Sequence, residues 1–350
     1  GNDMQDKTFH NKVTWFSFFF SLLVIWVHSY NIELHQATSP GLETVYRLQH
    51  AIGEGLSQIA VPGFFFISGY LFFRNFTWKK LPQKWGRRIR SVLIPYIVWN
   101  FLYYLGYVIG SHLPWIGNLM GKGVIPFQLF TAFDAIVHFR YNYVFWYLYQ
   151  LILLIAIAPI LYLFLQFAFG RILLVILVWV MVIFHKNVPV INGDAMIYFA
   201  TAGALALGLD SWVEERRKGN RILQVATGAV TVMGSVFVYH LSVSRNSVPL
   251  LLLCRLLAVA GLWTGIPKTS LPEAKDFMKY NFFLYAIHFV FVRFINKIIP
   301  RIFPGISANP VFLMGLYLIM PALIWAIGVP IGKFLKKRTP FLWSLLSGGR

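Results

Sequence analysis

The sequence predicts an all-α integral membrane protein, a single bundle of about ten transmembrane helices with both termini in the cytoplasm. Its 350 residues are 58% hydrophobic and 12% charged, which is about half the charged fraction of a soluble domain. The apolar residues form long runs, not the period-two alternation of a membrane β-barrel. The basic residues, which give a net charge of +19, lie mainly in short segments between these runs. This pattern is typical of loops held at a cytoplasmic membrane surface by anionic lipids and argues against a nucleic-acid partner.

The first expected transmembrane helix covers residues 13–32, which include no Lys, Arg, Asp or Glu. At about 1.5 Å rise per residue it can cross a bilayer core of roughly 30 Å. The run is too long for a signal-peptide core and lacks a small-residue cleavage site, so we expect it to remain in the protein. It carries one titratable group, His28, about one turn from its far end. An imidazole inside a membrane span is a candidate functional group, and the alternative is an anchor near the interface.

The second expected helix, residues 55–73, contains Pro62 and the pair Ser68-Gly69. Proline removes a backbone donor, and small residues let neighbouring helices approach closely, so we expect a kinked and tightly packed helix. The third expected helix, 91–111, has Pro95 in its first turn. Between these two helices we expect residues 74–90 to form the most basic loop of the chain.

Three arginines end this loop at the cytoplasmic mouth of the third helix. Arg87 and Arg90 are separated by three positions, with Arg88 between them. Two guanidinium groups at this spacing lie on one helix face and can bind phosphate groups in a bidentate manner. The alternative is that they serve only as a cytoplasmic anchor for the helix.

The fourth expected helix, residues 141–170, begins with an aromatic patch that includes Trp146 and Tyr147. Such a patch is more often a membrane-interface belt, and the alternative is a platform on which sugar rings stack. The segment before it, 120–142, is amphipathic, and we expect it to lie at the interface outside the membrane. The remaining expected helices are 172–185, 195–209, 222–244, 247–266, 280–299 and 310–332, of which the first two are short.

Two further ionisable residues lie inside expected helices: His288 is in the middle of 280–299, and Arg255 is within 247–266. A buried arginine needs an anion or a carbonyl as its partner. The alternative for Arg255 is that its side chain extends to the outer interface, since it stands about eight residues past the expected helix start. The only cysteine, Cys254, excludes an intrachain disulfide and a cysteine-based metal site, and we expect no bound metal.

The distribution of Lys and Arg sets the expected orientation. When the expected helices alternate in direction, most of these residues fall on the side that holds both termini, which places the termini in the cytoplasm. His28 then lies toward the outer half of its helix. We find no internal repeat and no linker that would separate a soluble part, so we expect a single domain over residues 1–350.

Five segments, in this order, resemble the acyltransferase-3 family: a histidine in the first helix, PGFFFISGYLF in the second, RRIRSVLIPYIVW opening the third, FWYLYQLILLIAIAPIL in the fourth and NFFLYAIHF in the ninth. The resemblance runs from about Phe9 to Lys337. Members of this family are multi-pass bacterial membrane enzymes that O-acylate cell-surface glycans. The resemblance therefore implies the bacterial cytoplasmic membrane as the location and a glycan acceptor outside it. The implied donor is acyl-CoA, with acetyl-CoA the first candidate, used from the cytoplasm as a co-substrate and without a permanently bound cofactor.

The resemblance also assigns roles. It implies that His28 is catalytic, and it matches Arg87, Arg90 and Ser68 to motifs of the family. We expect these three residues, together with Arg88 between the two arginines, to bind the donor. Candidate acceptor or transition-state contacts are Glu33, Trp146, Tyr147, Arg255 and His288. The family usually carries an arginine eleven residues before the histidine, and this chain has Ser17 there. Lys12 or the cluster Arg87–Arg90 could substitute for that arginine; a different donor, or a loss of activity, would also account for the missing charge.

Transfer from a thioester to a hydroxyl needs a base and a group that stabilises the developing oxyanion. The imidazole of His28 suits the role of base, or that of a transient acyl carrier. Its expected depth is about fifteen residues, or roughly 22 Å, from the cytoplasmic helix start, a depth that an extended pantetheine arm could span if the CoA phosphates rest on Arg87 and Arg90. The competing functions are a secondary transporter or glycan-lipid flippase, and a scaffold in which the polar residues are structural. Transporters often show inverted repeats, which we do not find.

Overall fold

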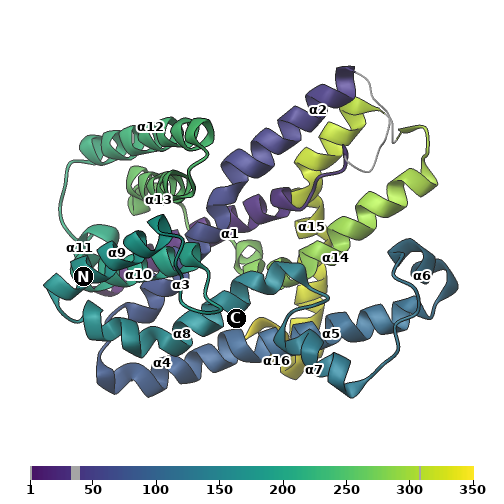
Figure 1. Ribbon diagram of the computed structural model, residues 1–350, viewed down its shortest axis with the longest axis horizontal. Helices are drawn as coiled ribbons and strands as arrows, with labels where there is room; N and C mark the ends of the chain where they lie inside the picture. The colour runs from purple at the N-terminus through teal and green to yellow at the C-terminus, as the bar shows by residue number, and fades with distance from the viewer. Residues whose placement is uncertain (1, 33–39, 307–308) are drawn as a thin grey trace. The chain divides into compact units, whose positions relative to one another are not determined.

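The computed structural model describes residues 2–32, 40–306 and 309–350, and every regular element in this part of the chain is helical. The all-α prediction is therefore confirmed. The α-helices, drawn in Figure 1, are α1 (Asn2–Val27), α2 (Pro40–His50), α3 (Ala60–Phe73), α4 (Leu81–Arg88), α5 (Ile94–Ser111), α6 (Pro114–Met120), α7 (Leu129–Val137), α8 (Trp146–Leu165), α9 (Ala168–Ile183), α10 (Gly193–Gly208), α11 (Asp210–Val213), α12 (Arg221–Arg245), α13 (Val248–Gly265), α14 (Asn281–Ile302), α15 (Pro310–Arg338) and α16 (Pro340–Ser347).

Within these described residues, seven helical stretches are long and apolar enough to cross a membrane. They are Gly41–Phe73, Trp78–Ser111, Tyr143–Leu165, Arg221–Arg245, Val248–Gly265, Asp276–Ile302 and Pro310–Arg338. The protein is thus a multi-pass membrane protein, while the number of ten spans and the orientation of the termini stay predictions.

The chain folds into two compact units, each assembled from separate stretches of sequence. Unit 1 contains residues 2–20, 58–84 and 153–279, and unit 2 contains the described residues of 21–57, 85–152 and 280–350. The boundary passes through α1, α4 and α8, so each of these three helices contributes residues to both units. His28, His288 and the three arginines at 87, 88 and 90 all belong to unit 2.

Close helix contacts in unit 1 are made at glycines. A Cβ at Gly69 of α3 would lie 3.0 Å from the Cβ of Ala202 on α10, and a Cβ at Gly228 of α12 would lie 2.1 Å from the Cα of Gly265 on α13. Neither pair of helices could approach so closely with a larger residue at these positions. The expected tight packing at Ser68-Gly69 is therefore confirmed, and its partner is α10.

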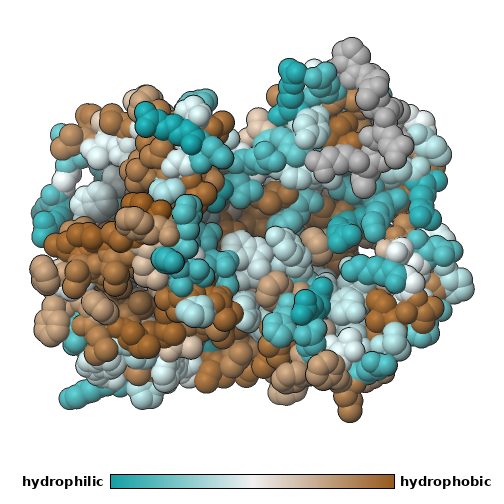
Figure 2. Space-filling view, in the orientation of Figure 1, coloured by the Kyte–Doolittle hydropathy of each residue, from teal (hydrophilic) through white to brown (hydrophobic). Residues whose placement is uncertain are grey.

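The outer surfaces of α9 and α12 in unit 1 are apolar. Ile176 and Ile183 of α9 and Met233 and Phe237 of α12 are each more than half exposed. Figure 2 shows such apolar surface, in brown, over the region that contains α8 and α9. Surface of this kind is what a helix presents to lipid acyl chains.

The segment predicted as a basic loop, residues 74–90, is largely helical, and this prediction was wrong. A 3-10 turn, η4 (Trp78–Lys80), leads into α4, and the π-turn η5 (Ile89–Leu93) joins α4 to α5 without a break. The third helix therefore begins at Trp78, not at residue 91, and Pro95 lies just after the π-turn. A π-turn has a wider backbone ring than an α-turn. It therefore leaves room for the proline ring at a position where proline cannot donate a backbone hydrogen bond.

Three other predicted boundaries were wrong. The helix expected over 55–73 is the last part of a helical stretch that begins at Gly41 and passes through the π-turn η2 (Ala51–Leu56) and the 3-10 turn η3 (Ser57–Ile59) into α3, because the polar residues before position 55 form α2 and not a loop. The helix expected over 13–32 ends at Val27, so its apolar part is shorter than expected. The helix expected over 141–170 is interrupted after Leu165, because Phe167 has an extended backbone (φ −114°, ψ 144°) and starts the separate helix α9. Gly170 permits this turn, since a Cβ there would lie 2.0 Å from the carbonyl oxygen of Phe164.

Candidate active site

Two histidines from distant parts of the sequence meet in unit 2. His28 follows the last residue of α1, Val27, and its backbone N–H donates to the carbonyl of Ile25 at 3.1 Å. His288 lies inside α14 and is fully buried. The Nε2 atom of His288 is 3.3 Å from the Nδ1 atom of His28, and their ring centroids are 5.2 Å apart. His28 was expected inside a helix, and its place in the turn after α1 brings its half-buried ring against α14.

The hydrogen bonds of the two rings define their tautomers. Nδ1 of His288 is 2.6 Å from the carbonyl oxygen of Tyr285, and Nδ1 of His28 is 3.0 Å from that of Val24. A carbonyl oxygen only accepts, so in the neutral rings both Nδ1 atoms carry the proton. Nε2 of His288 then holds a lone pair and accepts from the Nδ1–H of His28. Consequently Nε2 of His28 also holds a lone pair, and no partner for it is found among the described residues.

The chain immediately after His28 is held by a buried amide network. The side-chain NH2 of Asn31 donates to the carbonyl of Leu313 at 2.9 Å, and that of Gln49 donates to Oδ1 of Asn31 at 2.7 Å. Asn296 on α14, eight positions after His288, contacts the carbonyls of Ser29 and Tyr30 at 3.4 Å. Buried amides that satisfy one another fix a single local backbone conformation. This network therefore holds the turn that presents the His28 ring.

A tyrosine closes the other side of the histidine pair. Tyr285 lies one turn before His288 on α14, and its hydroxyl donates to the carbonyl of Val144. Phe145 stacks on its ring, with centroids 5.5 Å apart at 12°. Tyr147 is buried and packs edge-on against Tyr285, with centroids 6.1 Å apart, while Trp146 is half-buried. Of the two aromatic residues expected at the acceptor site, Tyr147 thus lies in the core beside the histidine helix.

The arginine cluster sits where α4 passes into the π-turn. Arg87 and Arg90 are exposed, and no hydrogen bond or ion pair of either side chain is found within the part of the chain that the structure describes. Arg88 is half-buried and interacts electrostatically with Tyr147 and with Arg350, which follows α16. Arg350 itself donates to the carbonyls of Ser91 and Ser347, at 2.8 and 2.7 Å. Two of the three predicted donor-binding arginines therefore present their guanidinium groups to the surrounding medium.

Two of the predicted site residues are not part of unit 2. Ser68 and Arg255 belong to unit 1, where Arg255 interacts electrostatically with Tyr198 of α10. Glu33 lies outside the described residues.

Lys12 was one candidate to substitute for the arginine that the family usually carries at the position of Ser17. Its amine already has partners in unit 1. It is fully buried; its Nζ donates to Glu215 at 3.0 Å and to the carbonyl of Trp263 at 2.6 Å, and it lies 4.1 Å from the Trp263 ring centroid. Burial lowers the pKa of Lys12 to about 8, and the charge of Glu215 only partly opposes this shift. An incoming anion would have to break these contacts, so we favour the arginine cluster for the donor.

The shifted pKa of Lys12 gives a pH-dependent stability. Below about pH 8 the amine is charged in the folded and unfolded states, and the full cost of burying the charge applies. Between pH 8 and 10.5 the folded state releases its proton first, so the free energy of unfolding should rise with pH, by about 3 kcal/mol. We expect the Tm of the wild type to rise across this range relative to that of Lys12→Met. The exposed Lys7, replaced in the same way, serves as the control; equal slopes for wild type and Lys12→Met would contradict the assignment.

Sequence reasoning missed several residues that shape this site. Asn31, Gln49 and Asn296 form the network behind His28, and Tyr285 packs against His288. For Asn296 a signal was present, because an amide inside an apolar helical run is costly unless it has a partner. Arg350 gave no comparable signal, since a basic residue beyond the last expected helix resembles any cytoplasmic anchor.

The all-helical fold with seven candidate membrane spans, together with two histidines in contact and two exposed arginines in unit 2, defines a multi-pass membrane protein with a compact polar site. The chain belongs to the acyltransferase-3 family: the family model described as an acyltransferase domain matches residues 13–345, nearly the whole chain. The resemblance inferred from the motifs is thereby confirmed, and membership supports a membrane acyltransferase. No curated protein and no solved structure matches the chain.

Proposed function

We propose that the protein transfers an acyl group, with acetyl the first candidate, from cytoplasmic acyl-CoA to a hydroxyl of an extracytoplasmic polysaccharide or glycan. The observation that carries this proposal is the position of the His28 ring, whose Nδ1 lies 3.0 Å from the carbonyl oxygen of Val24 and 3.3 Å from Nε2 of His288. This arrangement supports a lone pair on Nε2 of His28. Family membership supplies the reaction class, acyl transfer. We further propose that the chain lies in a bacterial cytoplasmic membrane with both termini inside, and that its two units form one catalytic domain.

The transfer can be written with His28 as the base. Nε2 of His28 removes the proton of the acceptor hydroxyl while the alcohol oxygen attacks the thioester carbonyl. The C–O bond of the ester forms, the C–S bond breaks, and the CoA thiolate leaves and takes up the proton held by the imidazolium. During this step the Nδ1–H of His28 donates to Val24 and to His288, which stabilises the positive charge on the ring.

The arginines at 87 and 90 are proposed to bind the phosphates of CoA. Both are exposed, and guanidinium groups bind phosphate oxygens in a bidentate manner. Replacing both with Gln should raise KM for acetyl-CoA about tenfold or more, since each charged contact contributes roughly 1 kcal/mol or more, while kcat changes little. Steady-state release of free CoA thiol measures both parameters.

The matched control for this pair is Lys336→Gln with Lys337→Gln, two exposed cations of α15 in the same unit. These changes should leave KM unaltered. Acetyl-dephospho-CoA, which lacks the 3′-phosphate, provides a second control, because the arginine changes should affect it less than acetyl-CoA. An unchanged KM for acetyl-CoA in the arginine variant would remove these residues from the donor site.

The proposed function is tested with the purified full chain in lipid nanodiscs, supplied with acetyl-CoA and a glycan fraction from its host. We expect free CoA to be released in proportion to new O-acetyl esters detected by mass spectrometry. Surface polysaccharide from cells with and without the protein should differ by the same esters. Substrate counterflow in vesicles without any CoA release would instead support the transporter alternative.

A further inference from the structure

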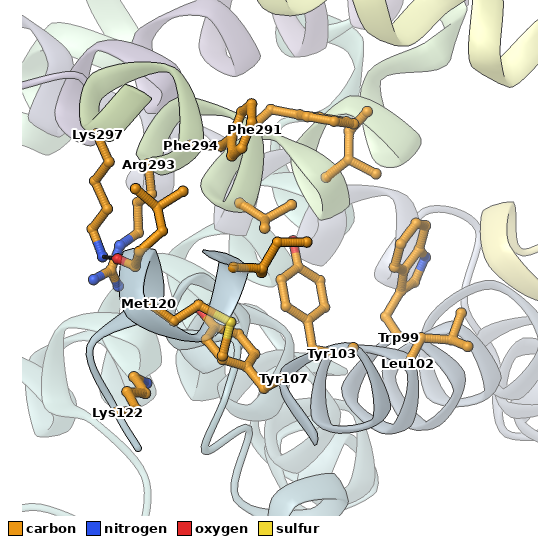
Figure 3. Close-up of a pocket in the computed structure, with 15 residues that line it drawn as sticks. Trp99, Leu102, Tyr103, Tyr107, Met120, Lys122, Phe291, Arg293, Phe294 and Lys297 are labelled. Carbon is orange, nitrogen blue, oxygen red and sulfur yellow. Dashed lines mark hydrogen bonds between the residues drawn. The ribbon is translucent and has the colours of Figure 1, made fainter. Parts of the chain in front are cut away.

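Unit 2 contains a cavity of about 440 Å3 between α5, α6 and α14. Figure 3 shows Trp99, Leu102 and Tyr103 of α5 on one wall and Phe291 and Phe294 of α14 on another. Its lining includes Ile287 but neither His28 nor His288, so it lies along a different face of α14 from the histidine pair. Most of its wall is apolar or aromatic, as in sites that enclose hydrocarbon.

Three cations gather at one end of this cavity. Arg293 and Lys297 extend from α14 and Lys122 follows α6, whereas Trp99 and Leu102 lie at the opposite end (Figure 3). Lys297 donates to the carbonyl of Leu119 at 3.3 Å, and the Nζ of Lys122 lies 4.7 Å from the ring centroid of Tyr107. Partial burial, followed by the charge of Arg293, lowers the pKa of Lys122.

The cations have no acidic partner among the described residues of unit 2. Its described acids are Glu43, Glu54 and Asp134, and each pairs elsewhere: with Arg47, with His50, and with His138 and Arg140, respectively. In the proposed orientation the cationic end lies on the outer side of the membrane. Cations that orient membrane helices gather on the cytoplasmic side, so this rule does not account for the cationic end of the cavity. A concentration of positive charge beside an apolar cavity, with no acidic partner among the described residues of the unit, favours an amphipathic anion as the ligand.

We propose that this cavity binds a lipid that carries a phosphate headgroup, with the phosphate on Lys122, Arg293 and Lys297 and the start of the hydrocarbon tail along Trp99, Tyr103 and Phe291. Arginine offers the phosphate a bidentate contact and the two lysines add point charges. The cavity is open to the surroundings at its wall and holds only part of a long tail, so the rest of the tail lies in the bilayer.

The position of the cavity gives such a lipid a role in the reaction. At about 1.5 Å per residue, Arg293 and Lys297 lie roughly 8 and 14 Å further along α14 than His288. A sugar linked to the bound phosphate would therefore start within a few sugar units of the imidazoles. This step rests on the proposed function: the lipid would be the carrier on which the glycan acceptor is presented.

Binding is tested without any acyl transfer, by native mass spectrometry of the purified full chain in detergent with a polyprenyl phosphate, the corresponding polyprenol and phosphatidylglycerol. The polyprenyl phosphate should bind at least tenfold more tightly than the polyprenol. The triple variant Lys122→Gln, Arg293→Gln, Lys297→Gln should weaken phosphate-lipid binding roughly thirtyfold or more, because three charged contacts are lost. The control replaces Arg301, Lys336 and Lys337, three other cations of unit 2, with Gln and should bind as the wild type does.

A second variant blocks the cavity and leaves its charges in place. A Cβ at Gly106, on the wall formed by α5, would meet no heavy atom within 4 Å, so Gly106→Phe should fold and fill the space, with Gly106→Ala as its control. We expect Gly106→Phe alone to reduce phosphate-lipid binding. Loss of phosphatidylglycerol binding in the two cavity variants would identify a bilayer phospholipid as the source, and selective loss of polyprenyl phosphate would identify a carrier lipid. Equal binding by wild type and both variants, or equal binding of the polyprenol, would overturn the proposal, whatever the outcome of the CoA-release assay.

Discussion

Replacing His28 with alanine is expected to lower kcat for acyl transfer by about a thousandfold or more, while the protein stays folded in the membrane. General base catalysis contributes roughly 10²–10⁴ in rate, and no second ring nitrogen is placed to substitute: Nδ1 of His288 is bonded to Tyr285, and its Nε2 faces His28. The measurement is CoA release and ester formation by purified protein at saturating acetyl-CoA.

The chain offers a matched control in the same unit. His112 also follows the end of a helix, α5, and its Nδ1 also contacts the carbonyl four residues earlier, that of Val108, at 2.7 Å. It is exposed, and none of its contacts among the described residues is with a second histidine. His112→Ala should therefore reproduce any effect of removing a histidine from a helix end without affecting kcat. Full transfer activity in His28→Ala would show that the base lies elsewhere and would leave the arginine and cavity proposals standing on their own tests.

The sequence predicted the individual members of this site better than their arrangement. His28 and His288 stood out because an ionisable group inside an apolar run is costly, and this argument needs no knowledge of the fold. Their pairing could not be predicted, because they are separated by 260 positions and the contact depends on how α1 and α14 pack. Nor could the tautomers be predicted, because they follow from the backbone carbonyls of Val24 in α1 and Tyr285 in α14.

The errors in the fold share a physical cause. Residues 74–90 were taken as a loop because they are basic, yet a helix with one charged face is stable at a membrane surface. The first helix was extended to residue 32 because no charge interrupts it, but the chain leaves the helix after Val27. There the amide of Asn296 donates to the carbonyls of Ser29 and Tyr30, and the side-chain oxygen of Gln49 accepts from the backbone N–H of Asn31. In both cases the helix end was placed from charge and hydropathy alone, and these do not report the local interactions that determine where a helix begins or ends.

The second large effect is expected at His288, which we assign as a positioning residue. Replacing it with leucine removes the lone pair that accepts the Nδ1–H of His28, so the ring loses one of its two orienting partners and the stabilisation of its charged form. We expect kcat to fall about a hundredfold, within the range of general acid–base contributions, while KM for acetyl-CoA stays unchanged because the arginines are untouched. A merely structural role would lower protein yield and Tm without this separation of kcat from KM.

Rescue by a conservative variant separates orientation from packing. The side-chain oxygen of glutamine can accept the same hydrogen bond, so His288→Gln should recover part of the lost kcat, whereas His288→Leu fills a similar volume without an acceptor. Because His288 acts only through His28, adding His288→Leu to His28→Ala should cause little further loss, although independent contributions would multiply. If the two losses multiply, or if leucine and glutamine give the same kcat, then His288 does not orient the base and the hydrogen bond between the two rings has no part in catalysis.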